Sequence, residues 1–466
     1  MIRVPAASLL APSRLDICSK IPLATAWKNG ADERWGRDLY FSYLEKIHPF
    51  GGFNQDLGKT TLEDYYFSFR QLFHSISSNG FNQELGGIPF GNKGITNGAH
   101  RVAVSVALGL EVSIEKSLDV DHVYDWRFLE DIGLDGVFVD GIMSEFLDHR
   151  PNTRIFCLMG LETHVSNGVE DYLNRNRNVI FRKTISLTSV GQRRLMQILY
   201  GANPWWNHSL FETLTLERFK GNTDTVTFVF IEAQSISDDV HLKDQLRSIF
   251  LHSESIKKLH STDTQEEVTR LSDTILNSNS IHFMNYAPIG AEAKVFTRIR
   301  QNSEKSNAGN QEFTIDGSSI LEMYSIRQAN DLDYVTQGNI WHQSEAPESH
   351  NHEYDTQLIK PSDLFFDPRA FFKWDGLKFM SLPALITFKA FRGEEKDLLD
   401  ITTILENLER LPRYSTAGSL RKARKFKVML LLRKNVERLL SHMPNSVSTQ
   451  VKSTYRCLRQ AYRLLE

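Results

Sequence analysis

The sequence predicts a multidomain α/β (α+β) protein, and three observations support this class. The chain has 466 residues, enough for two to four domains, and 41% of them are apolar, enough to build packed cores. Short β-rich runs alternate with longer segments of helical periodicity. A polar linker and a basic C-terminal segment interrupt this pattern. We therefore predict an N-terminal domain, a middle α/β region, a mixed-sheet domain and a basic helical tail, at residues 1–150, 151–301, 302–410 and 411–466.

The N-terminal domain opens with helical patterns. We predict an aromatic helix over residues 35–47 and a second helix over about 62–77, which Gly80 would end. A short strand near Ile88 and a helix over residues 99–108 complete the predicted elements of this domain.

The helix that follows Gly98 carries a candidate phosphate site in Gly98-Ala99-His100-Arg101. Gly98 frees the backbone, and His100 and Arg101 stand at the positive end of the predicted helix. An arginine fork suits a phosphate. A plainer interpretation is also open, in which His100 and Arg101 cap and solvate a helix whose Val102 and Val106 face belongs to the core.

From about residue 69 to 112, the order of helix, glycine turn, strand and Gly-x-His-Arg-x-x-Ala helix resembles the ParB/sulfiredoxin fold. Members of that family bind nucleotides, segregate DNA or transfer phosphoryl groups. The resemblance implies that Gly98 and Arg101 bind nucleotide phosphates and that His100 is catalytic. DNA binding is disfavoured here, because acidic residues follow the motif and no dense Lys/Arg patch surrounds it.

The middle region carries no motif that identifies its chemistry. Buried strands are predicted at residues 154–159 and 225–231, and helices at 190–200, 242–250 and 266–277. Between the last two helices, Thr262 or Thr264 with Glu267 is typical of a capping box. In an alternative interpretation, His260 and Asp263 face a substrate.

The most informative stretch follows a polar linker at residues 302–311. Gly317-Ser318 is followed, one predicted helix later, by Asp331 and Asp333. On a strand these two carboxylates would project to the same face, about 7 Å apart. Paired carboxylates suit Mg²⁺, and a Gly-Ser turn brings N–H groups and a hydroxyl to a phosphate. The alternative is an acidic turn that ends a surface strand.

This order resembles the nucleotidyltransferase superfamily, and Gly376–Leu382 followed by Lys389, Arg392 and Lys396 resembles its helical region. The resemblance implies Mg²⁺ or Mn²⁺ held by Asp331 and Asp333, and ATP or another nucleoside triphosphate as substrate. Gly317, Ser318, Lys389 and Lys396 would bind its phosphates. These enzymes use a third carboxylate, for which Asp367 is the chosen candidate and Asp363 the alternative. Without a third carboxylate, a degenerate domain becomes plausible.

Composition and charge restrict the cellular locations that are expected for the protein. No apolar run reaches 18 residues, which argues against a membrane span. Three widely separated cysteines suggest reduced thiols and a cytoplasmic location. His342, His350 and His352 lie in a polar stretch that we interpret as a solvated loop. From residue 411 onward the chain has 13 Lys and Arg residues against 2 Glu.

The basic tail reads as an amphipathic helix or helix pair over residues 418–465. Such helices attach reversibly to anionic membranes, which would place the protein peripherally at the inner face of the membrane. The alternatives are a helix packed on the body with a solvated basic face, and a nucleic-acid-binding arm, which we disfavour because apolar residues are dense.

These observations predict a metal-dependent transferase that moves a nucleotidyl or phosphoryl group to a hydroxyl. By analogy with cytosolic enzymes that build polysaccharide at the membrane, we expect a saccharide or sugar-phosphate acceptor and a role in cell-surface polysaccharide biosynthesis. Two alternatives remain open: a ParB-like nucleotide-gated DNA-binding protein, and a toxin-type nucleotidyltransferase that modifies protein or RNA.

Overall fold

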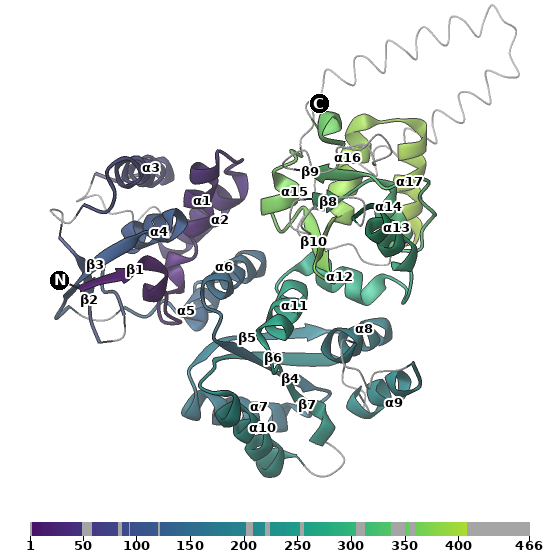
Figure 1. The fold of residues 1–466 in the computed structure, drawn as a ribbon, viewed down its shortest axis with the longest axis horizontal. Helices are drawn as coiled ribbons and strands as arrows, with labels where there is room; N and C mark the ends of the chain where they lie inside the picture. The colour runs from purple at the N-terminus through teal and green to yellow at the C-terminus, as the bar shows by residue number, and fades with distance from the viewer. Residues whose placement is uncertain are drawn as a thin grey trace, which may run out of the picture. The chain divides into compact units, whose positions relative to one another are not determined.

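The computed structural model describes residues 2–48, 58–82, 86–92, 94–119, 122–201, 208–219, 224–251, 256–303, 313–336, 350–354 and 359–407. Within these ranges the chain is mixed α/β, with 17 α-helices and three small sheets (Figure 1). It divides into two compact units, Met1–Leu382 and Pro383–Glu466. The coarse α/β class predicted from the sequence is confirmed, whereas the four-domain division stays a prediction.

The first sheet has the strand order β1-β3-β2, with β1 antiparallel and β2 parallel to the central strand. Helix α4 follows β2 and precedes β3; a left-handed Gly109 ends it. Thr61 caps α3 in a reciprocal capping box with Asp64, which fixes where that helix begins. The elements of this region are β1 (Ile2–Pro5), α1 (Ile21–Asn29), α2 (Arg34–Ile47), α3 (Leu62–Asn79), β2 (Ile88–Phe90), α4 (Ala99–Leu108), β3 (Glu111–Lys116), α5 (Trp126–Asp131) and α6 (Gly136–His149).

The second sheet is fully antiparallel, in the order β5-β6-β4-β7. Strand β6 lies between β4 and β5, so β4-α7-β5 is a split β-α-β unit of ferredoxin-like type. A helical pair, α8 and α9, is inserted before β6. The elements are β4 (Thr153–Met159), α7 (Thr163–Asn176), β5 (Val179–Ser186), α8 (Ser189–Tyr200), α9 (His208–Phe219), β6 (Thr225–Glu232), α10 (Ile236–Phe250), β7 (Leu259–Ser261) and α11 (Gln265–Ile275).

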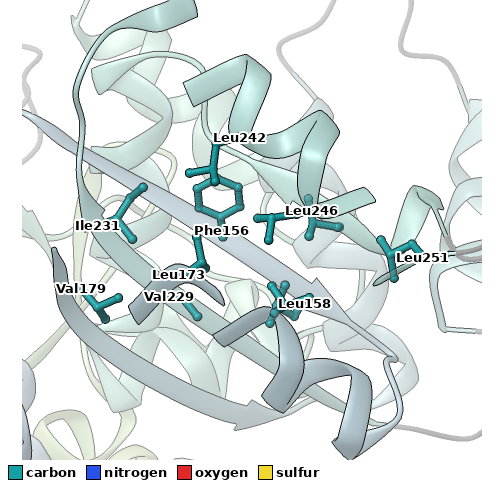
Figure 2. Packing of buried hydrophobic residues seen from close by; sticks show 11 residues of the cluster. Phe156, Leu158, Leu173, Val179, Val229, Ile231, Leu242, Leu246 and Leu251 are labelled. Carbon is teal, nitrogen blue, oxygen red and sulfur yellow. The ribbon is translucent and has the colours of Figure 1, made fainter. Parts of the chain in front are cut away.

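Helices α7 and α10 cover one face of this sheet and enclose a hydrophobic cluster (Figure 2). Phe156 and Leu158 alternate along β4 and both point to this face, as period-2 geometry requires. Leu173 from α7 and Leu246 from α10 pack against them and are fully buried. Cys157 and its partner His260 lie between these positions and therefore face the opposite side of the sheet.

The third sheet has the order β10-β11-β8-β9, in which β8 and β11 are parallel and the outer pairs antiparallel. Asp375 and Gly376, both with positive φ, close the tight β10–β11 hairpin. The elements are α12 (Ser278–Tyr286), α13 (Ala293–Ser303), β8 (Phe313–Ile315), α14 (Ser318–Met323), β9 (Tyr334–Thr336), a 3-10 helix η7 (His350–Tyr354), α15 (Asp363–Phe366), β10 (Phe371–Trp374) and β11 (Leu377–Met380).

Helix α12 is fastened to the third sheet by polar and aromatic contacts. Asn277, its N-cap, and Asn279 both donate to the Pro368 carbonyl, at 3.0 and 3.1 Å. The Phe283 ring stacks on Phe372 with centroids 4.7 Å apart. The sheet therefore depends on a helix that precedes residue 302.

The second unit contains α16 (Leu382–Arg392) and α17 (Glu395–Asn407) in its described part. Residues 408–466, and with them the predicted basic tail, lie outside the described residues. In the part of the chain that is described, no helix combines the length and apolarity needed to cross a bilayer.

Most predicted helices and strands are confirmed within a few residues. The predicted 35–47, 62–77 and 99–108 helices correspond to α2, α3 and α4, and the predicted strands to β4 and β6. Thr264 caps α11 by accepting from the Glu267 N–H, so the predicted N-cap is confirmed. The Glu267 carboxylate accepts from the Asp263 N–H and not from that of Thr264, so the reciprocal half of the predicted capping box is not formed. Asp367, the candidate third carboxylate, directly follows the helical turn α15, which residues 363–366 form.

Candidate functional site

The Gly317-Ser318 turn joins β8 to α14 and lies against both predicted aspartates. Gly317 has φ +62°, and a Cβ at this position would fall 2.3 Å from Oδ2 of Asp333. Only glycine leaves room for that carboxylate and tolerates this backbone conformation. Ser318 Oγ lies 3.4 Å from Oδ1 of Asp331. Both carboxylates therefore adjoin the same two-residue turn.

The prediction that the two aspartates lie on a strand is wrong. Strand β9 begins at Tyr334, so Asp331 and Asp333 both precede it. Leu332 between them is buried, and Asp331 is exposed. The Asp333 carbonyl accepts a 3.1 Å hydrogen bond from the Asp316 N–H, which joins this segment to the end of β8.

An arginine from α13 holds the segment before Asp331. Arg298 Nη1 donates to the carbonyls of Ala329 and Asp331, at 3.1 and 3.2 Å. Its Nη2 pairs with Glu322 of α14, whose carboxylate also accepts from the Ala329 N–H. Ser319 Oγ adds a 3.3 Å hydrogen bond to the Asp331 carbonyl. The position of Asp331 is thus set from both neighbouring helices.

A third carboxylate, Asp316, stands directly before the turn. It is fully buried, and within the described residues its Oδ1 has no hydrogen-bond partner. Its Oδ2 accepts a 2.7 Å hydrogen bond from Tyr354. The sequence reasoning missed Asp316; its one signal was a carboxylate next to Gly-Ser at the end of a short strand.

His350 bridges two of these carboxylates. Its Nε2 lies 3.2 Å from Asp333 Oδ1, and its Nδ1 lies 3.4 Å from Asp316 Oδ2. Burial alone would lower the pKa of His350, but the two carboxylates outweigh burial and raise it to about 10. The imidazole is thus cationic at neutral pH. The interpretation of His350 as a solvated loop residue is wrong; His342 lies outside the described residues, and the His352 side chain is not described.

Asn351 fixes this histidine segment to the sheet. Its side-chain oxygen accepts from the Thr336 N–H at 3.0 Å, and its amide nitrogen donates to the Thr336 carbonyl at 2.7 Å. The amide thus pairs with β9 as a neighbouring strand would, and it places His350 beside Asp333.

The proposed third ligand, Asp367, has its contacts elsewhere. Arg369 donates to both of its carboxylate oxygens and also pairs with Asp38 of α2 at 2.8 Å. Asp363 pairs with Arg34 at 2.9 Å. Asp316, not either of these residues, is the carboxylate that His350 links to Asp333.

The basic candidates Lys389 and Lys396 belong to the second unit. Lys389 is buried and contacts Asp397 and Asp400 at 3.0 and 2.9 Å. Lys396 is exposed and pairs with Glu394 at 3.1 Å. Both ammonium groups therefore have carboxylate partners within that unit.

The N-terminal candidates gather at the start of α4. Gly98 has φ +88° and precedes the helix as its N-cap. The Nε2 of His100 lies 2.8 Å from the Tyr40 hydroxyl, and its ring packs against Phe69. Burial, with smaller contributions from nearby lysines, holds the pKa of His100 well below its usual range, so this imidazole is neutral.

Arg101 directs its guanidinium to the backbone. Its Nη1 and Nη2 donate to the carbonyls of Gly86 and Gly87, at 3.0 and 3.3 Å. Val102 and Val106 are buried, as the plainer interpretation of this helix expects. A phosphate bound here would meet the α4 N-terminus and a neutral His100, and Arg101 only after its carbonyl contacts changed.

Comparison with known proteins adds no relative. No match to a protein family, to a curated protein or to a solved structure was found for this chain.

Proposed function

We propose that the chain is a metal-dependent transferase that moves a nucleotidyl or phosphoryl group from a nucleoside triphosphate to a hydroxyl. The observation that supports this proposal is the meeting of Asp331 and Asp333 at the Gly317-Ser318 turn. Turn N–H groups and a hydroxyl suit a phosphate, and adjacent carboxylates suit the cation that accompanies it.

The donor atoms fit a hard divalent cation in their chemistry. Asp331 and Asp333 offer carboxylate oxygens, and the buried Asp316 offers an oxygen that lacks a hydrogen-bond partner among the described residues. No three His, Cys, Asp or Glu side chains in the described ranges already stand as ligands of one ion. The cationic His350 lies where Asp316 and Asp333 face each other. A bound Mg²⁺ or Mn²⁺ would neutralise and orient the donor phosphates.

Side-chain and backbone groups of the chain would position the phosphates and the carboxylates. Ser318 and the backbone of the turn would hold phosphate oxygens, and the Arg298–Glu322 pair keeps Asp331 in place. Phosphoryl-type transfer depends mainly on such positioning and on charge stabilisation. The His100 region is proposed as a second nucleotide-binding site; its support is the left-handed Gly98 at the α4 N-terminus.

The acceptor that we propose is a saccharide or sugar phosphate, in polysaccharide assembly at an anionic membrane surface. Its support is the sequence of the basic tail alone.

The test is incubation of the full chain with Mg²⁺ and each labelled nucleoside triphosphate, followed by detection of label transfer or phosphate release. We expect Asp331→Asn and Asp333→Asn to abolish activity. His100→Ala would abolish it only if the first domain also takes part. Activity that survives Asp331→Asn unchanged would remove the central assignment.

A further inference from the structure

The imidazole of His350 lies between two carboxylates that come from different parts of the third sheet. Its Nε2 lies 3.2 Å from Oδ1 of Asp333, directly before β9, and its Nδ1 lies 3.4 Å from Oδ2 of Asp316, directly after β8. A hard divalent cation also binds between carboxylate oxygens, because each oxygen contributes negative charge. The histidine therefore occupies the position between the two carboxylates that suits such a cation.

The polar atoms at this position are only partly satisfied. Asp316 is fully buried, yet its Oδ1 has no hydrogen-bond partner among the described residues. The Nδ1 atom of His350 is also buried and makes no hydrogen bond within the same part of the chain. Native proteins leave few such buried atoms, since each costs free energy. A cation bound to Asp316, with the imidazole moved to solvent, removes both costs.

The imidazole can leave this position while the rest of η7 stays in place. The Asn351 amide makes two hydrogen bonds to the Thr336 backbone, and the Tyr354 hydroxyl donates to Oδ2 of Asp316 at 2.7 Å. These contacts hold the short helix and do not involve the imidazole. The His350 side chain keeps 18% of its surface exposed, whereas the Asp316 side chain is fully buried. A change of rotamer is therefore the shortest route by which the ring reaches solvent.

We propose that Mg²⁺ or Mn²⁺ binds between Asp316 and Asp333 in the place of the His350 imidazole, which rotates into solvent when the ion binds. Without the ion, the imidazole keeps the buried Asp316 from standing as an uncompensated charge. The ion must displace this side chain to reach the two carboxylates. This inference rests on the proposed function, which requires the metal. It adds that His350 competes with the ion and is not one of its ligands.

The first experiment measures metal affinity in the absence of a nucleotide. Binding of Mn²⁺ to the full chain is followed by electron paramagnetic resonance of the free ion, and Mg²⁺ is then added as a competitor. We expect His350→Gln to bind Mn²⁺ roughly tenfold more tightly than the unaltered chain, because the ion no longer displaces a charged contact. His164→Gln is the matched control. It removes an exposed histidine that lies 3.4 Å from Glu162, and it should leave the affinity unchanged.

The second experiment follows His350 in the unaltered chain. The protein is labelled with ¹⁵N-histidine and titrated with Mg²⁺. The His350 resonance is identified by its absence in His350→Gln, or in His350→Ala if the first variant fails to fold. We expect this resonance to move in a saturable way towards the position of an exposed histidine such as His164.

Three outcomes would overturn the proposal: equal or weaker Mn²⁺ binding in His350→Gln, an unmoved His350 resonance at saturating Mg²⁺, and no Mn²⁺ binding by either protein. Weaker binding would make His350 a ligand of the ion or a support for its ligands. Transfer activity of the same preparations separates this inference from the proposed function. Transfer with unchanged Mn²⁺ affinity would contradict the inference alone, whereas tighter binding without transfer would contradict the proposed function alone.

Discussion

The phenol of Tyr354 donates a 2.7 Å hydrogen bond to Oδ2 of Asp316, and this contact joins η7 to the end of β8. Asp316 is fully buried, so a group other than bulk water must satisfy its carboxylate. Tyr354 satisfies one oxygen, and His350 lies beside it. The helix η7 thus supplies both the hydroxyl that binds Asp316 and the cationic His350 next to the candidate site.

Asp316→Asn should weaken activation by Mg²⁺ roughly 10–100-fold, because a carboxylate beside the proposed ligands is neutralised. The measurement is transfer activity against Mg²⁺ concentration. Asp367→Asn is the matched change, and it should leave this dependence unaltered, since Asp367 pairs with Arg369. If Asp367→Asn weakened activation by Mg²⁺ and Asp316→Asn did not, Asp367 would again be the candidate for the third carboxylate.

Gly317→Ala should lower the free energy of unfolding by about 3 kcal/mol, because it combines positive φ with a clash against Asp333. Gly376→Ala is the control. Its φ is +77° but no atom lies within 4 Å of the added Cβ, so strain alone should cost about 1 kcal/mol. Urea unfolding of both variants checks the difference, and equal losses would show that Asp333 does not restrict the turn.

Acidification should destabilise the protein in part through His260. Burial, with smaller contributions from nearby cations, lowers its folded pKa to about 3, below the ordinary value of 6.5, so the unfolded chain binds the proton more readily. The stability that the neutral His260 contributes to the folded state is fully present above pH 6.5 and is lost as the pH falls towards 3. Between pH 7 and pH 5 it should remove about 2 kcal/mol. His260→Gln should lose correspondingly less stability over this interval; parallel pH profiles would contradict the assignment.

Lys389→Met should cost about 3 kcal/mol of stability, because it leaves Asp397 and Asp400 without their shared buried ammonium group. Lys396→Met removes an exposed cation and should change stability by less than about 1 kcal/mol. Thermal unfolding of the two variants measures this contrast. If Lys389→Met left the stability unchanged, the ion pairs of Lys389 would not be needed for folding, and Lys389 would be available for a role other than a structural one.

A fragment spanning residues 302–410 should fail to fold. It lacks α12, whose Asn277, Asn279 and Phe283 contact the third sheet. Proton NMR of the fragment should show the narrow dispersion of an unfolded chain. A dispersed spectrum would support the domain boundary that the linker composition predicts.

The sequence predicted helices well, because their ends are encoded locally. Thr61 with Asp64, Thr264 with Glu267 and the glycines that follow α3 and α4 are read directly from neighbouring residues. The Gly317, Ser318, Asp331 and Asp333 grouping also follows from one short segment.

The residues that were missed depend on contacts distant in the chain. Asp316 gains its role from Tyr354, 38 positions later, and His350 gains its role from Asp316 and Asp333 together. The only local signal of Asp316 is its place directly before Gly317-Ser318, and His350 stands in a stretch whose composition is typical of a loop. Amino-acid composition indicates only the average exposure of a segment. The position of this segment is set by a specific contact, that of the Asn351 side chain with the Thr336 backbone.

The pairing of Asn351 with Thr336 has a further consequence for association between copies of the chain. Strand β9 is the outermost strand of its sheet, and such strands expose backbone groups that can recruit another polypeptide. The Asn351 amide occupies the N–H and carbonyl of Thr336 and blocks that end of the strand. An intramolecular side chain thus takes up, at this end of β9, the backbone groups through which a second chain could pair.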